Sequence, residues 1–92
     1  PDMSGVFDES DFALSSHKSG QTVKSGRVVL EGTAKAGDKL HTFVNGKLRM
    51  KSTATADGKW DAPLPLKSPG TRTIKVLNLT QKKSQVLKLI VK

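Results

Sequence analysis

The sequence lacks cysteine and tyrosine, and its 92 residues include only one tryptophan and three phenylalanines. Without cysteine, a disulfide framework, a thiolate metal site and a cysteine nucleophile are excluded, so packing must stabilise the fold. No apolar run extends beyond residues 28–30 or 89–91, far short of the ~20 residues of a membrane-spanning helix. No signal-peptide pattern opens the chain. Because the sequence begins at Pro1 rather than Met, we expect it to be a piece of a longer or processed protein.

Acidic residues are scarce outside the N-terminal segment. The chain has 16 Lys and Arg against 8 Asp and Glu, a net charge of +8. Half of the acids lie before residue 12, whereas every basic residue lies from Lys18 onward. Such a field favours anionic partners: nucleic acid, acidic polysaccharide, lipopolysaccharide or an anionic membrane surface. The alternative is that the lysines only keep strand faces soluble and block edge-to-edge aggregation.

Short alternating segments separated by turn dipeptides fill the chain from residue 27 to residue 92. The turns are Asn45-Gly46, Asp57-Gly58 and Pro69-Gly70. A period of two places alternate side chains on opposite faces, which indicates strands with one buried face. The pattern predicts an all-β antiparallel sandwich with no helix of useful length. The apolar segments are 28–30, 40–44, 60–62, 73–76 and 87–91.

Two regions are expected. Residues 1–10 are polar and acidic, and we interpret them as a flexible N-terminal arm or linker. Residues 11–92 form the sandwich domain, in which residues 11–26 make a first edge strand that breaks and rejoins.

Trp60 is the largest apolar residue, and strand parity places it in the core. Its burial is favoured over an exposed position where the ring stacks on a sugar or base. The predicted inward positions are Val28, Leu30, Leu40, Thr42, Val44, Leu48, Met50, Trp60, Ala62, Leu64, Ile74, Val76, Leu87, Leu89 and Val91.

Several ordered segments carry a resemblance to a known family. Residues 23–34 (VKSGRVVLEGTA), 36–40 (AGDKL), 44–46 (VNG) and 53–60 (TATADGKW), then the closing alternating strand, resemble bacterial immunoglobulin-like domains of the cysteine-free type. Such domains occur in surface adhesins and as accessory modules beside envelope or carbohydrate-active enzymes. The resemblance covers roughly residues 20–92. It implies an immunoglobulin-like sandwich of about seven strands in an extracellular, cell-surface or periplasmic setting, and it transfers no ligand site.

The chain departs from antibody-type domains. It lacks the inter-sheet cysteine pair and the tyrosine of the tyrosine corner, and its tryptophan falls on the fifth predicted strand rather than the third.

One outward face interleaves lysine with apolar residues. If the third, sixth and seventh predicted strands share a sheet, as in immunoglobulin-type sandwiches, their outer surface is a candidate contact face. We expect it to dock a protein partner, a neighbouring domain or an amphipathic anion. The alternatives are that Phe7 or Phe12 covers Phe43, that Leu77 and Leu79 lie beneath the 79–84 loop, or that the residues are simply exposed. The candidate residues are Phe43, Leu77 and Ile90, ringed by Lys39, Lys75 and Lys88.

A basic stripe is the second candidate site. It would bind an anionic polymer such as an acidic glycan, lipopolysaccharide or nucleic acid. Nucleic acid is disfavoured, because only Phe43 could stack on a base. The stripe consists of Lys47, Arg49 and Lys51 with Lys82 and Lys83.

Catalytic and metal-binding constellations are not apparent. We expect neither His17 nor His41 to have a serine or carboxylate partner. Asp38, Asp57 and Asp61 are scattered, which disfavours a calcium site. The sequence therefore predicts a non-enzymatic interaction or spacer module, without metal or cofactor, in a bacterial or phage surface or envelope protein. A passive stalk repeat without a partner remains a third possibility.

Overall fold

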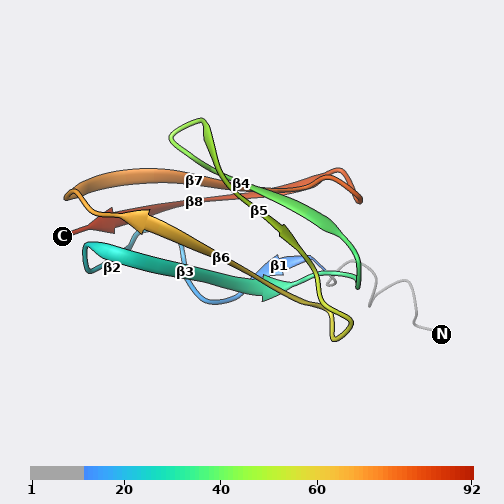
Figure 1. Cartoon of the computed structure of the whole chain (residues 1–92). Coiled ribbons are helices and arrows are strands. Elements are labelled where there is room, and N and C mark those ends of the chain that lie inside the picture. Colours follow the sequence, from blue (N-terminus) through green and yellow to red (C-terminus); the bar gives the residue numbers. More distant parts are fainter. Residues whose placement is uncertain (1–11) are drawn as a thin grey trace.

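Two packed β-sheets form the chain, as the sequence predicts. The computed structural model describes residues 12–92, which contain eight strands in a β-sandwich (Figure 1). The predicted N-terminal arm, including Phe7, lies outside the described residues. The smaller sheet has the order β1 (Ala13–Leu14), β3 (Gly26–Thr33), β6 (Lys59–Leu66). The larger has the order β2 (Gln21–Val23), β8 (Lys83–Val91), β7 (Gly70–Asn78), β4 (Lys39–Val44), β5 (Lys47–Thr53).

The first strand is divided between the two sheets, which explains eight strands where about seven are expected. β1 pairs antiparallel with β3, whereas β2 pairs parallel with β8, so the sandwich is not wholly antiparallel. Gly20 stands between them with φ +90°, a left-handed conformation that favours glycine. The break and rejoining predicted for residues 11–26 is confirmed.

The two sheets group the strands as expected from the resemblance. β3 and β6 pair in one sheet, while β4, β7 and β8 lie side by side in the other. β5 extends the larger sheet at its edge. The residues 12–92 include no helix long and apolar enough to cross a membrane.

Trp60 anchors the interior at one end of the smaller sheet. The side chain is 3% exposed, its Nε1 donates to the Thr33 carbonyl oxygen at 3.0 Å, and its ring lies 6.5 Å from that of Phe12. Gly32 is opposite Trp60 in the register, and a Cβ there would meet the indole Cζ2 at 2.7 Å and the Ala13 carbonyl oxygen. The glycine therefore makes room for the indole, and burial excludes Trp60 as a stacking platform.

The predicted core is confirmed except at Leu48. Met50 is half-buried and packs against the core, and the other predicted inward residues are buried. Leu48 is 42% exposed. A register shift between Thr42 and Phe43 pairs Met50 with inward Thr42 but Leu48 with outward Phe43. The bulge thus turns Leu48 to the outer face, against simple alternation.

A polar cluster joins the turn before β4 to the β7–β8 hairpin. The Asp38 Oδ2 accepts hydrogen bonds from Asn78 Nδ2 at 2.9 Å, Gln81 Nε2 at 2.7 Å and the Lys35 amide at 3.2 Å. Desolvation of the buried carboxylate raises its pKa, but these hydrogen bonds and the Lys35 charge outweigh it, so the Asp38 pKa is lowered. Asp38 is therefore a structural residue of the fold.

Candidate functional site

Neighbouring strands of the larger sheet bring apolar and basic side chains into one outer surface. Phe43 pairs with Leu48 on one side and with Lys75 on the other, and Lys75 pairs in turn with Val86. Leu77 follows two residues after Lys75 on the same face. We call these five residues the apolar-basic face.

The apolar-basic face surrounds a shallow hollow of about 380 Å³. Phe43, Lys75, Leu77 and Val86 line it, with Gly46 and Thr73. Val86 is 59% exposed, while Phe43 and Leu77 are half-buried. Contiguous apolar side chains of this kind on an exposed sheet are typical of a contact surface.

The charges that border the hollow have one sign. Lys51 is paired with His41, whose ring lies 6.4 Å from that of Phe43, and Lys88 is paired with Thr73 at the hollow's rim. No acidic residue belongs to the described parts of the strands that form this sheet. A complementary surface would therefore be apolar with an acidic rim.

The register unites some of the predicted contact residues and separates others. Phe43, Leu77 and Lys75 lie together. Ile90 pairs with Thr71, four residues from Val86, which is about 13 Å along β8 at roughly 3.3 Å per residue. Lys39 pairs with Thr53 at the other end of β4. Ile90 and Lys39 are thus outside the hollow. Val86 lines it instead, and Leu48 lies beside Phe43 on the same face.

Of the proposed covers of the apolar-basic face, Phe7 lies outside the described residues, whereas Phe12 and the 79–84 loop lie within them. Phe12 is 5% exposed and packs on Trp60 inside the sandwich, so it does not cover Phe43. Leu79 is 40% exposed, so the 79–84 loop does not bury it.

The predicted basic stripe is divided between separate places. Lys51 pairs with His41 beside the apolar-basic face, whereas Lys82 and Lys83 lie at the β7–β8 hairpin. Lys47 and Arg49 instead border a hollow of about 500 Å³ between the β4–β5 hairpin and the β6–β7 turn. Lys67 and Arg72 border the same hollow, and the sequence-based prediction included neither.

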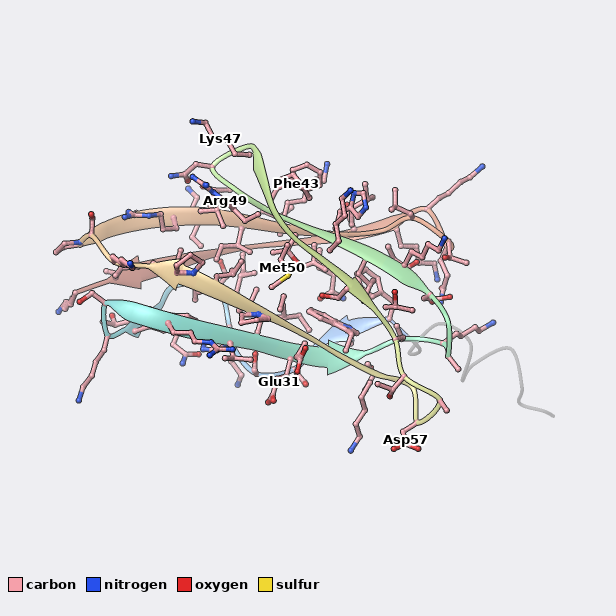
Figure 2. All side chains as sticks on the ribbon, viewed as in Figure 1. Glu31, Phe43, Lys47, Arg49, Met50 and Asp57 are labelled. Atoms are coloured by element: carbon pink, nitrogen blue, oxygen red, sulfur yellow. The ribbon has the colours of Figure 1, made fainter. Side chains whose placement is uncertain are left out.

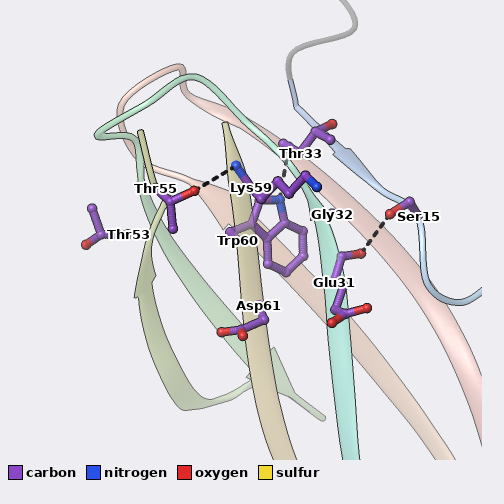
Figure 3. A pocket seen from close by; sticks show the side chains of 9 residues that line it. All are labelled: Ser15, Glu31, Gly32, Thr33, Thr53, Thr55, Lys59, Trp60 and Asp61. Atoms are coloured by element: carbon purple, nitrogen blue, oxygen red, sulfur yellow. Dashed lines mark hydrogen bonds between the residues drawn. The ribbon is translucent and has the colours of Figure 1, made fainter. Parts of the chain in front are cut away.

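A third hollow, of about 440 Å³, lies on the smaller sheet (Figure 3). Glu31 and Asp61 are directly opposite each other in its lining, and both are exposed. The rest of the lining is Ser15, Gly32, Thr33, Thr53, Thr55, Lys59 and the edge of Trp60.

One histidine does have a serine partner, contrary to the expectation from sequence. Ser16 Oγ lies 2.7 Å from His17 Nδ1, and the same oxygen accepts the Glu31 amide at 2.9 Å. A hydrogen bond between adjacent loop residues leaves no periodic pattern in the sequence, so the alternation of strands could not predict it. The contact fastens the loop after β1 to β3.

Candidate metal ligands do not converge in residues 12–92. No group of three or more His, Asp or Glu side chains there could hold an ion. Asp38 bonds to Asn78 and Gln81, Asp57 lies in a turn, and Asp61 lies on the outer face of β6.

Comparison with known proteins gives a structural likeness only. Neither a protein-family model nor a curated protein sequence matches the chain. A crystal structure of XAC1771, a carbohydrate acetylesterase from Xanthomonas citri, superposes with a TM-score of 0.69 at 17% identity. The match covers 80% of this chain and 17% of that enzyme, so the chain is similar to a small part of a much longer protein. At this identity the likeness shows the fold, a β-sandwich.

Proposed function

We propose that the chain is a non-enzymatic ancillary β-sandwich domain of a larger bacterial surface, envelope or secreted protein. It docks against a neighbouring domain of the same polypeptide through the apolar-basic face. The observation that carries the proposal is the hollow around Phe43, Lys75, Leu77 and Val86, in which four strand positions combine apolar surface with charge of one sign.

The occupant follows from the chemistry of the face. Val86 is 59% exposed and Leu48 42% exposed, so docking would remove apolar surface from water. Lys75 and Lys88 then contact acidic residues at the rim of the neighbouring domain. Likeness to a part of a longer carbohydrate-acting enzyme supports a domain among other domains.

The experiment compares the 92-residue chain with the complete gene product by calorimetry. A contact formed only in the folded state stabilises the domain by mass action, so its unfolding transition is expected at a higher temperature in the complete protein. The V86K substitution places a charge in the apolar hollow and removes that increase. V29K is the matched control, because Val29 is an exposed valine on the outer face of the smaller sheet.

Two results would overturn the proposal. One is a reading frame that encodes no domain besides this one. The other is a transition temperature that is equal in the isolated and complete proteins, or that V29K lowers as much as V86K.

A further inference from the structure

Two edge strands leave a basic groove at the end of the sandwich opposite the Trp60 end. β5 is one edge of the larger sheet, and β6 is one edge of the smaller. The groove between the β4–β5 hairpin and the β6–β7 turn has Lys47, Arg49, Lys67 and Arg72 in its lining and no acidic residue. Figure 2 shows Lys47 and Arg49 on the hairpin, far from Glu31 and Asp57 on the other side of the molecule.

Backbone carbonyl oxygens hold the Arg72 guanidinium in place, and no carboxylate of residues 12–92 pairs with it. Its Nη2 donates to the Ser68 carbonyl oxygen at 2.7 Å, and its Nη1 lies 3.5 Å from that of Thr71. Gly70, two residues before Arg72, has φ +138°, a backbone conformation that favours glycine. Several of the five guanidinium N–H donors remain available to an anion.

The hairpin that carries Lys47 is fixed relative to the strand that carries Arg72. Asn45 donates its amide to the Thr73 carbonyl oxygen at 2.8 Å, and its Oδ1 accepts the Thr73 amide at 2.9 Å. Asn45 and Gly46 both have positive φ, as a tight hairpin turn requires. The backbone positions of Lys47 and Arg72, on two sides of the groove, are therefore fixed relative to each other.

The groove is longer than one carboxylate or phosphate group, because a second hollow extends it. A second hollow of about 240 Å³ adjoins it, shares Leu64, Pro65 and Lys67 with it, and adds Arg27. Pro65 is exposed between the two hollows. The cations thus follow an elongated path past an apolar surface, which suits a chain-like ligand.

We propose that this basic groove binds an acidic polysaccharide, with its carboxylates on Arg49, Lys67 and Arg72 and a sugar ring's C–H face on Pro65. Arginine's planar fork matches a carboxylate in two parallel hydrogen bonds. Nucleic acid is disfavoured, since single strands are held by stacking on aromatic side chains and the groove has none. The site goes beyond the docking proposed above and uses different residues.

The test uses the 92-residue chain and a galacturonic acid oligosaccharide, followed by amide chemical shifts and calorimetric titration. Shift changes are expected around residues 47–49 and 65–72. Affinity is expected to fall steeply between about 50 mM and about 200 mM salt, because binding releases counterions. The R49Q/K67Q variant is expected to lower the slope of log affinity against log salt by about one to two units.

The K82Q/K83Q variant is the matched control, since it removes the same charge at the β7–β8 hairpin. It should retain the parent salt slope and shift pattern. No binding at low salt, or an equal loss in both double variants, overturns the proposal. Tighter binding of a single-stranded DNA of similar length overturns the polysaccharide assignment, and binding of a neutral galactan with equal affinity overturns the role of the cations. V86K tests the docking face separately and should leave this binding intact.

Discussion

The outer faces of the two sheets differ although their inner faces are alike. On the smaller sheet, β3 and β6 present Glu31 and Asp61 together with Lys59 and a single exposed valine, Val29. On the larger sheet, the exposed positions form the apolar-basic face with charge of one sign. Burial constrains only the inward residue of each alternating pair, and both sheets meet that constraint. The outward residues are not needed for the core and can therefore differ between the sheets. The contrast supports the proposal that the apolar-basic face of the larger sheet docks a neighbouring domain.

The largest expected effect tests whether both inner faces contribute alike. Trp60→Ala on the smaller sheet should lower the free energy of unfolding by about 3 to 5 kcal/mol, and Ile74→Ala on the larger by about 2 to 5 kcal/mol, since both are buried. Chemical denaturation of the two variants measures this. A loss below about 1 kcal/mol for either would show that the sheet concerned does not pack as described.

The next effect concerns the turn that closes the sandwich at Asp38. Its lowered pKa means that the carboxylate's stabilisation is present above the unfolded-state pKa near 3.8 and is lost as pH falls through the lower folded-state value. Asp38→Asn should cost about 1.5 to 3 kcal/mol at neutral pH, the usual worth of hydrogen bonds to a charged group.

Urea titrations from neutral pH down through pH 3.8 provide the check. The difference in unfolding free energy between the parent and Asp38→Asn should shrink as the pH falls below 3.8. A difference that stays constant, or that grows in acid, is inconsistent with an ionised Asp38.

A stabilising change is expected inside the larger sheet. Thr42 is 1% exposed, and its Oγ1 has no hydrogen-bond partner within residues 12–92. Thr42→Val keeps the shape and removes the unsatisfied hydroxyl, so the free energy of unfolding should rise by about 1 kcal/mol. Thr73→Val is the exposed comparison on the same sheet and should change little; thermal melting that ranks the two variants in the opposite order contradicts this account of the core.

The smallest effect distinguishes the bulge from simple alternation. Leu48 and Met50 share parity in sequence, but only Met50 packs against the core. Leu48→Ala should change the unfolding free energy by about 0.5 kcal/mol or less, as is usual for surface sites, whereas Met50→Ala should cost more. Equal losses by denaturation would place both side chains inside.

The sequence periodicity predicted which side chains face the core, but it did not predict which outward side chains lie next to each other on adjacent strands. Alternation predicted the inward set, because burial on one face imposes period two. The shared sheet of β4, β7 and β8 was expected instead from the resemblance to immunoglobulin-type sandwiches. It failed at Leu48, since the bulge depends on how β5 pairs with β4. Grouping Ile90 with Phe43 and omitting Val86 has the same origin, because only the register decides which outward residues meet.

Side chains that act through loops were also beyond the sequence pattern. Arg72 joins Lys47 and Arg49 only because the β6–β7 turn comes back beside the β4–β5 hairpin. Asp38 appears as an isolated acid in the sequence, and its partners Asn78 and Gln81 are about forty residues away. Neither grouping has a periodic signal.

Hydroxyl-radical footprinting of the complete gene product tests the contact face most directly. The oxidation of Phe43 and Val86 should be several-fold lower there than in the isolated 92-residue chain, while the oxidation of Val29 should be the same in both. Equal oxidation of Phe43 and Val86 in the two proteins, or protection of Val29 alone, would contradict the assignment of the larger sheet as the docking surface.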